Sequence, residues 1–292
     1  MEYKDWLILV TIHKERNITK AAERLYTTQP ALTYRLQHLE KEFGTAIVSR
    51  SKKGVEFTTQ GEYLVQYAKK MLIELEKTKD YVNNMGNAVT GSLRLGTSSV
   101  IARYKLPPIL KDFLEFYPDV EINLKTGWSV DINHMLHKEE VHLGIVRGDY
   151  PWHGQKSFIS EETICIASKK EINFEDLPKL PRINYGTDQT LLNLIQSWWQ
   201  ETFNVPPSIT MEVDRIDTCK EMVLHGLGYA ILPSVCLSEG ENLYIYKLHS
   251  KDNKPITRKT WLIYRESSLQ LSMVKAFVDF MENNTRPILP AR

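Results

Sequence analysis

A predicted helix that begins at Gln29 and ends before Gly44 carries the most suggestive chemistry in the chain. Thr28 is a favourable N-cap, Pro30 fits a first helical turn, and Gly44 suits a left-handed residue after the last turn. Such a helix fits the DNA major groove, where amides and hydroxyls read base edges and small apolar groups touch a thymine methyl. A solvated helix face is the alternative explanation. The candidate DNA contacts are Thr28, Gln29, Pro30, Ala31, Thr33, Tyr34, Arg35, Gln37 and His38.

A basic turn follows this helix. Arg50, Lys52 and Lys53 lie between a short apolar strand at 46–48 and a second strand at 55–58, which predicts a β-hairpin. Cations on a turn suit phosphate or minor-groove contacts, which add affinity and salt dependence but no base choice. The alternative is an ordinary charged hairpin tip.

The elements that must position these groups occupy residues 1–58. A first helix has an apolar face between Trp6 and Ile12, and Thr19 precedes a second short helix at 20–25. Residues 1–60 hold ten Lys and Arg against seven Asp and Glu, a surplus too small to indicate nucleic-acid binding by itself. The order of helix, turn, capped helix and basic hairpin predicts a winged helix-turn-helix. The buried stripe of its third helix is expected to be Leu32, Leu36, Leu39 and Phe43.

Residues 59–89 are predicted to form a long linker helix. Thr59 and Glu62 fit a capping box at its start. Apolar residues then recur at alternating spacings of four and three, which is the heptad pattern of a coiled-coil seam. We therefore expect this helix to pair with a second copy of the chain, with packing inside one chain as the alternative. The predicted dimerisation residues are Leu64, Ala68, Met71, Leu75, Val82 and Met85.

Strand-like and helix-like segments alternate from residue 90 onward, which predicts an α/β domain with mostly parallel sheets. Two sets of segments indicate two lobes, one of about 90–161 and 267–292 and the other of about 162–266. Ligands of such sheets bind beyond the carboxyl ends of the strands, where hydroxyls and free backbone N–H groups suit a carboxylate or other anion. Each residue alone is better explained as a cap or surface group, but their shared placement favours a pocket. The candidate effector contacts are Thr97, Ser98, Ser99, Trp128, Ser129, Arg147 and Thr187.

Two basic side chains in this domain have open roles. Arg147 follows the third predicted strand and is the expected positive charge of the pocket, although pairing with nearby Asp149 is the alternative. His142 opens the same strand, where a packed neutral histidine is favoured over a pH-dependent contact.

Composition and motifs argue against several other classes of protein. The chain is 42% hydrophobic and 25% charged, as ordinary globular proteins are, and has no apolar run long enough to span a bilayer. Its first residues do not resemble a signal peptide, so a cytoplasmic protein is expected rather than a secreted solute-binding protein. No nucleotide loop or nucleophile elbow is present, so no catalytic residue, cofactor or metal is predicted. A ligand-binding protein or an enzyme with a winged-helix head is the alternative.

The cysteines and histidines carry weaker signals. Cys165, Cys219 and Cys236 form no metal-ligand spacing, and buried free thiols are favoured over a redox sensor. His134 and His137 are three residues apart on a predicted helix, where a solvated helix end is favoured over a metal site.

These motifs together resemble the LysR-type transcriptional regulators over the whole chain. In the head the likeness rests on Ala21-Ala-Glu-Arg-Leu25, Thr28-Gln-Pro-Ala-Leu-Thr33, Leu39-Glu-Lys-Glu-Phe-Gly44, and Gly54-Val-Glu-Phe-Thr58 followed by Gly61. In the C-terminal domain it rests on Gly91-Ser-Leu-Arg-Leu-Gly96, Leu106-Pro, Phe116-Tyr-Pro118, and Gly226-Leu-Gly-Tyr-Ala-Ile-Leu-Pro233. All of these motifs occur in order, which makes the resemblance specific.

The resemblance implies a winged helix-turn-helix, a dimerising linker helix and a sensor domain with the two-lobed α/β fold of periplasmic binding proteins. It implies homodimers that commonly pair into homotetramers on palindromic double-stranded DNA, with a small metabolite as coinducer. Contact with RNA polymerase is left open. The chain departs from the family pattern at Tyr34 and His38, where basic residues are common, and at His142, where Asp is frequent. Val48-Ser49 likewise replaces the usual Phe-Glu.

Overall fold

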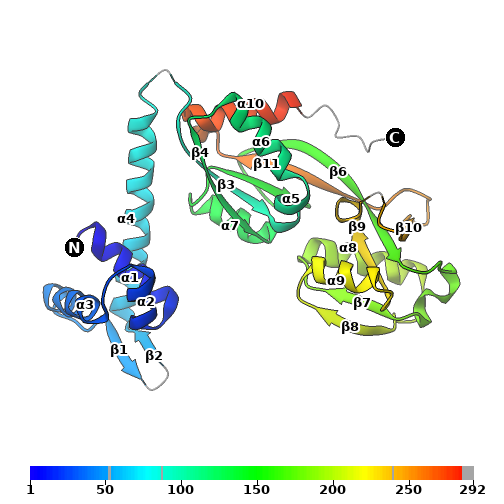
Figure 1. Ribbon diagram of the computed structural model, residues 1–292, viewed down its shortest axis with the longest axis horizontal. Helices are drawn as coiled ribbons and strands as arrows, with labels where there is room; N and C mark the ends of the chain where they lie inside the picture. The colour runs from blue at the N-terminus through cyan, green and yellow to red at the C-terminus, as the bar shows by residue number, and fades with distance from the viewer. Residues whose placement is uncertain (52–53, 87, 239, 285–292) are drawn as a thin grey trace. The chain divides into compact units, whose positions relative to one another are not determined.

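The computed structural model describes residues 1–51, 54–86, 88–238 and 240–284 of the 292-residue chain. The chain divides into two compact units, Met1–Met85 and Gly86–Arg292 (Figure 1). Each unit is a folded body with its own hydrophobic core.

The first unit is a three-helix head with a hairpin and a long helix. Asn17 caps the second helix, because its side chain accepts a hydrogen bond from the Lys20 N–H at 3.0 Å. The predicted start at Thr19 was therefore two residues late. Thr28 caps the third helix, which ends at Gly44 in the left-handed conformation with φ 63°, as the sequence predicts. The elements are α1 (Tyr3–Glu15), α2 (Ile18–Arg24), α3 (Gln29–Phe43), β1 (Val48–Ser51), β2 (Gly54–Phe57) and α4 (Thr59–Asn83).

The core of this head extends into α4. Leu64, Val65 and Ala68 are buried in one cluster with apolar side chains of α1, α3 and the hairpin. Each fully buried large apolar side chain of such a core stabilises the fold by about 1.5–3 kcal/mol. The expectation that Leu64 and Ala68 form a seam for a second chain was therefore wrong, since the head itself covers them.

The third helix also departs from its predicted stripe. Leu32, Leu36 and Leu39 are buried, but Phe43 is 43% exposed. The helix ends at Phe43, so no following turn of helix covers the ring.

Lobe I of the second unit is built on one end of a mixed sheet. Its strands are β3 (Gly91–Ser98), β4 (Val120–Gly127), β5 (Leu143–Arg147) and β11 (Thr257–Tyr264). The strand order is β4-β3-β5-β11, with β3 parallel to β4 and β5 and with β11 antiparallel to β5. Its helices are α5 (Ser99–Tyr104), α6 (Leu106–Phe116), α7 (Ser129–His137) and α10 (Ser272–Asn284).

The long strand β6 (Gln155–Ser168) joins the two lobes. Its first part pairs with β11 and its last part pairs with β9 and β10. Since Leu262 and Tyr264 lie in the lobe I core, the chain has returned to lobe I by β11. The predicted boundary of lobe II at about residue 266 is therefore wrong for β11.

Lobe II holds the other end of the sheet, with strand order β6-β9-β7-β8 and with β7 parallel to β8. Trp198, Trp199 and Tyr229 anchor its core. Its strands and helices are β7 (Arg182–Tyr185), α8 (Gln189–Thr202), β8 (Ile209–Val213), α9 (Ile216–Leu224), β9 (Tyr229–Pro233) and β10 (Tyr244–Lys247). Short 3-10 turns lie at η1 (Phe174–Lys179), η2 (Ser234–Cys236) and η3 (Glu266–Gln270).

Candidate DNA interface and effector site

Helix α3 presents a polar face to solvent. The side chain of Tyr34 is 71% exposed, and Gln37 and His38 lie on the same open face one turn further along. The Gln29 amide donates a hydrogen bond to the Thr33 hydroxyl at 3.0 Å, which orients both groups at the start of the helix. Most of the predicted DNA contacts are therefore accessible: Thr28, Gln29, Pro30, Ala31, Tyr34, Gln37 and His38 are exposed and Thr33 is half-buried.

Arg35 is the exception among these residues. Its Nε donates to Asp5 Oδ1 at 2.5 Å, and its Nη2 donates to Asp5 Oδ2 at 2.9 Å and to Glu2 Oε1 at 2.7 Å. This fork holds α3 against the start of α1 and engages Nε and Nη2 of the guanidinium. Three of the five N–H donors of Arg35 are therefore engaged by two carboxylates, which favours a structural role over the predicted contact with a base or a phosphate.

The other half of this pair, Asp5, is fully buried. Burial by itself raises the pKa of the carboxyl, but the hydrogen bonds from Arg35 and from the Glu2 backbone and the charge of Arg35 outweigh it. The pKa of Asp5 therefore lies below its ordinary value. The same hydrogen bond raises the pKa of Arg35. The pair is a charged structural contact across 30 residues of sequence.

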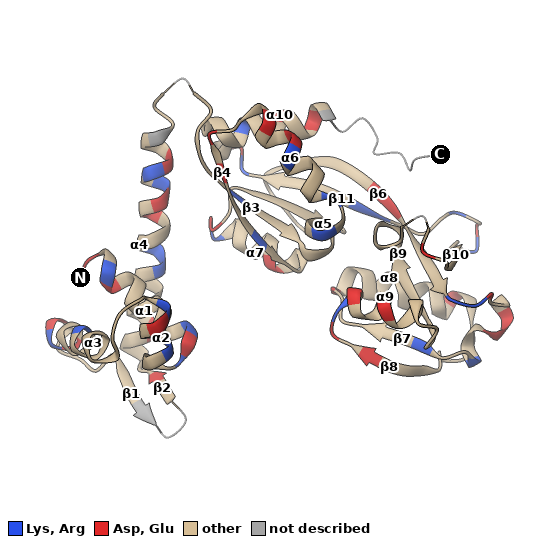
Figure 2. Cartoon of the chain, in the orientation of Figure 1, with Lys and Arg blue, Asp and Glu red and all other residues tan. Residues whose placement is uncertain are grey.

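The charge pattern of the head is mixed, with Lys and Arg interspersed among Asp and Glu (Figure 2). In the predicted wing, the backbone of Arg50 pairs with Val55 in the hairpin, while Lys52 and Lys53 lie outside the described residues. The role of these three cations therefore stays a prediction.

In the second unit, a small cavity of about 70 Å³ lies between the lobes. Six of the seven predicted effector contacts line it: Ser98, Ser99, Trp128, Ser129, Arg147 and Thr187. Thr97 does not, because its side chain is fully buried and its hydroxyl faces the Ser98 carbonyl at 3.5 Å. Sequence reasoning missed Tyr185, Asp188, Asp214, Arg215 and Asp217, which also line the cavity and lie at or shortly after the ends of β7 and β8.

Arg147 lines this cavity, but a carboxylate of the same chain already balances its positive charge. Its guanidinium forms an ion pair with Glu162, with Nε 2.7 Å from Oε1, and its side chain is only 3% exposed. The alternative partner Asp149 instead pairs with Lys156 at 2.7 Å. Arg147 is therefore corrected from a free positive charge to one half of a buried pair.

The N-terminus of α8 is also occupied. Asp188 is its N-cap and accepts hydrogen bonds from the Thr190 and Leu191 N–H groups at 3.1 and 3.2 Å. Arg258 lies 2.5 Å from the same carboxylate. Burial alone raises the pKa of Asp188, but the charge and hydrogen bond of Arg258 outweigh it, so the pKa lies below its ordinary value. The sequence predicts free backbone N–H groups beside Thr187 at the start of this helix. In the structure, the Asp188 carboxylate accepts hydrogen bonds from two of them.

A polar contact joins the two lobes at the rim of the cavity. The Tyr104 hydroxyl of lobe I donates to Asp217 Oδ1 of lobe II at 2.6 Å, and Arg103 Nε lies 3.2 Å from the same oxygen. Burial and this hydrogen bond raise the pKa of Tyr104. We call Arg103, Tyr104 and Asp217 the interlobe latch.

The remaining candidate residues, which are histidines and cysteines of the second unit, are buried or make hydrogen bonds within the chain. His142 is buried, and its Nδ1 accepts a hydrogen bond from the Arg94 N–H at 3.2 Å. His137 lies 2.8 Å from the Asn133 carbonyl, and no cluster of metal-ligating side chains occurs in the described ranges. The three cysteines are buried and unpaired, and burial raises the pKa of Cys219 and Cys236 to about 12. Thiols of this kind are protonated and poorly reactive at neutral pH.

Comparisons with known proteins agree with this architecture. A family model described as "Bacterial regulatory helix-turn-helix protein, lysR family" matches residues 3–62, and one described as "LysR substrate binding domain" matches residues 86–286. The chain is 46% identical to the uncharacterized HTH-type transcriptional regulator YraN of Bacillus subtilis (strain 168), with 97% of this chain and 98% of that protein covered. It is 38% identical to the uncharacterized regulator YkuM of the same organism, with 97% of each covered.

Solved structures share the fold. The crystal structure of full-length CbnR complexed with its target DNA has a TM-score of 0.72 at 18% identity, and covers 97% of this chain and 99% of that chain. The full-length structure of the Vibrio cholerae virulence activator AphB has a TM-score of 0.66 at 17% identity, and covers 97% and 99%.

The head and the two-lobed domain define a DNA-binding transcription regulator with an effector-binding domain. The chain belongs to the LysR family. Its relatives are regulators rather than enzymes, which confirms the non-enzymatic function predicted from the sequence. Within the described residues, no helix is both long and apolar enough to cross a membrane.

Proposed function

We propose that this regulator binds a roughly palindromic operator as a homodimer, or as a homotetramer made of two such dimers, in the cytoplasm. The exposed polar face of α3 carries this proposal, because its amides, hydroxyls and imidazole are accessible while the apolar stripe is buried. Two α3 helices related by a twofold axis would enter successive major grooves about 10 bp apart. RNA polymerase is a further proposed partner, since a regulator of this class acts at promoters.

The direct test is the affinity of the full chain for the DNA upstream of its own gene. Fluorescence anisotropy with this fragment and with random DNA of equal length should show specific binding tighter by about 10³-fold or more. Specific binding should also weaken steeply with salt if the wing contacts phosphates. Equal affinity for the two DNAs would contradict sequence-specific regulation.

We further propose that the effector is a small carboxylate held in the cavity between the lobes. Ser99 and Ser129 of lobe I and Thr187 of lobe II line this cavity. The Ser99 hydroxyl donates to the Gly127 carbonyl at 3.3 Å and the Ser129 hydroxyl accepts from the Arg147 N–H at 2.9 Å, so Thr187 is the hydroxyl proposed to meet the ligand. The buried Arg147 is paired with Glu162, so Arg215 is the proposed partner of the ligand charge. Its exposed guanidinium lies 3.8 Å from the exposed carboxylate of Asp214, a solvent-screened pair that a ligand can displace more easily than a buried one. A volume of about 70 Å³ is too small for most metabolites, so binding would require the lobes to separate or rearrange. Such a ligand favours one arrangement of the lobes, which is what an effector needs in order to change DNA binding.

A thermal-shift screen of metabolites on the full chain, followed by calorimetric titration, tests this effector site. Thr187→Val removes a hydroxyl at nearly constant shape and should weaken the effector found by screening by about 1–2 kcal/mol. Thr210→Val, on exposed β8 outside the cavity, is the matched control. An effector that is cationic or purely apolar would overturn the carboxylate proposal. Unchanged affinity in Thr187→Val would overturn the contact assigned to Thr187.

A further inference from the structure

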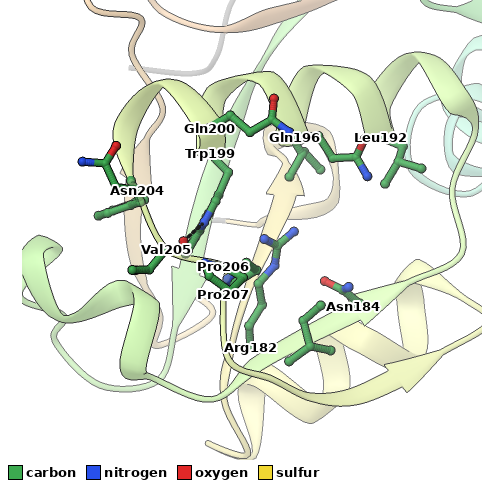
Figure 3. Close-up of a pocket in the computed structure, with 13 residues that line it drawn as sticks. Arg182, Asn184, Leu192, Gln196, Trp199, Gln200, Asn204, Val205, Pro206 and Pro207 are labelled. Atoms are coloured by element: carbon green, nitrogen blue, oxygen red, sulfur yellow. Dashed lines mark hydrogen bonds between the residues drawn. The ribbon is translucent and has the colours of Figure 1, made fainter.

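Lobe II contains a second and larger cavity, of about 590 Å³, away from the interlobe site (Figure 3). It lies between α8, the loop that follows α8 and the start of β7, and it shares no lining residue with the cavity between the lobes. Its volume falls within the range of about 300–1,000 Å³ that is typical of small-molecule sites.

One side of this cavity is formed by a buried arginine. Arg182 opens β7, and its side chain extends into the space beneath α8 (Figure 3). Arg182 is 8% exposed, and its buried Nε has no hydrogen-bond partner. No described carboxylate forms an ion pair with it, and its charged contact is with the ring of Trp199, whose centroid is 5.3 Å away.

This arginine differs from Arg147 and Arg258, two other buried arginines of the same domain. Arg147 pairs with Glu162, and Arg258 pairs with Asp188. The titratable groups that act on Arg182 are Tyr229, Tyr185 and Cys219, whose pKa values are all raised, so each is neutral at neutral pH. Burial lowers the pKa of Arg182, yet a guanidinium stays protonated in proteins.

A buried cation without a counter-charge is unfavourable, because removal from water is not offset by an opposite charge. The π face of Trp199 offsets only part of this cost. A negative group that entered the cavity would therefore gain a charge-assisted contact that nothing in the described chain now makes.

The rest of the lining indicates the kind of molecule that carries this charge. The amides of Asn184, Gln196 and Gln200 can donate or accept hydrogen bonds beside the guanidinium. The apolar part of the cavity lining consists of Leu192, Trp199, Phe203, Val205, Pro206 and Pro207. We propose that this cavity is a second ligand site, which binds a small organic monocarboxylate with its carboxylate on Arg182 and its apolar body against Trp199 and the 203–207 loop.

This second site is independent of the proposed effector site, although α8 contributes to both. Leu192 lines the second cavity, while its neighbour Leu191 lines the cavity between the lobes. A ligand at Arg182 therefore contacts a helix whose N-terminus borders the interlobe cavity.

The test uses the full chain with phenylacetate as the probe and phenylacetamide as its uncharged analogue. Calorimetric titration should show one phenylacetate per chain and no detectable phenylacetamide. Arg182→Gln removes the charge and should weaken phenylacetate at least tenfold. Lys179→Gln removes a positive charge from an exposed position of the same lobe and should leave binding unchanged.

Arg182→Met guards against a variant that fails to fold. The Arg182 guanidinium has no counter-charge in the ligand-free protein, so this variant should have a melting temperature equal to or above that of the wild type. Phenylacetate should no longer raise the melting temperature of the variant. Binding of phenylacetate that survives in both Arg182 variants would overturn the proposal, as would no binding to the wild type. A third contradicting result is an Arg182-dependent oligomer in light scattering without phenylacetate binding, since an acidic group of a second copy would then supply the counter-charge.

Discussion

At the scale of the residue, two of the three arginines in the predicted sites behave alike. Arg35 and Arg147 were expected to meet a ligand, and both are held by carboxylates of the same chain. An arginine on the exposed side of a predicted element is therefore not by itself a ligand contact. In α3 the uncharged side chains remain available for base recognition.

The Arg35–Asp5 pair predicts an acid-sensitive head. Asp5→Asn removes charge-assisted hydrogen bonds and should destabilise the head by about 2 kcal/mol at pH 7. Because the pKa of Asp5 is lower in the folded state, its stabilisation is complete above its ordinary pKa and is lost as pH falls through the folded-state value. Urea denaturation of the wild type and Asp5→Asn should therefore converge in strong acid. The exposed variant Glu23→Gln is the control, and a difference that persists in acid would argue against this ionic role.

Gln29 should contribute to the choice of base. Gln29→Ala should weaken specific DNA binding by about 1–3 kcal/mol, because a bidentate amide contact is lost, and should affect random DNA little. Arg35→Lys should instead lower the melting temperature of the head, since Lys cannot form the same fork. Anisotropy titrations and thermal melts on both variants separate the roles. A base-specific defect in Arg35→Lys at unchanged stability would restore Arg35 as a DNA contact.

At the scale of the element, the sequence predicts local features well. Thr28, Pro30 and Gly44 locate α3 because caps and turns depend on neighbouring residues. The alternation of strands and helices likewise predicts the α/β domain. The ion pair of Arg35 with Asp5 could not be predicted, since it joins residues 30 positions apart. The predicted heptad seam is wrong at the start of α4 for a related reason, because the periodicity of apolar residues does not reveal which surface covers them.

The two halves of helix α4 are accordingly expected to have different roles. Ala68 belongs to the head core, so Ala68→Asp should destabilise the head by about 4 kcal/mol through a buried unpaired carboxylate. Val82 and Met85 are 56% and 69% exposed, so Val82→Asp with Met85→Asp should leave the head folded and weaken the proposed dimer. Circular dichroism and light scattering on the two variants measure these effects. A native oligomer in the Val82/Met85 variant would move the dimer contact away from the end of α4.

At the scale of the whole molecule, the interlobe latch of Arg103, Tyr104 and Asp217 is expected to restrain the two lobes of the sensor. Tyr104→Phe removes one hydrogen bond to a carboxylate, worth about 1.5–3 kcal/mol, so opening of the lobes should increase roughly tenfold or more. Hydrogen–deuterium exchange of the amides at 98–101 and 214–217 should rise in this variant. Tyr244→Phe, on an exposed strand of lobe II, should leave exchange unchanged. Equal exchange in all three proteins would show that the latch does not restrain the lobes.

The polar face of α3 is proposed to select DNA sequence as part of a symmetric dimer. In vitro selection from random duplex DNA, carried out in parallel with the wild type and Gln29→Ala, tests this proposal most directly. The wild type should enrich two inverted half-sites whose centres are about 10 bp apart or a multiple of this spacing. Gln29→Ala should lose preference at one position in each half-site and keep it elsewhere. An enriched motif without inverted symmetry, or one identical in the two proteins, would contradict the account.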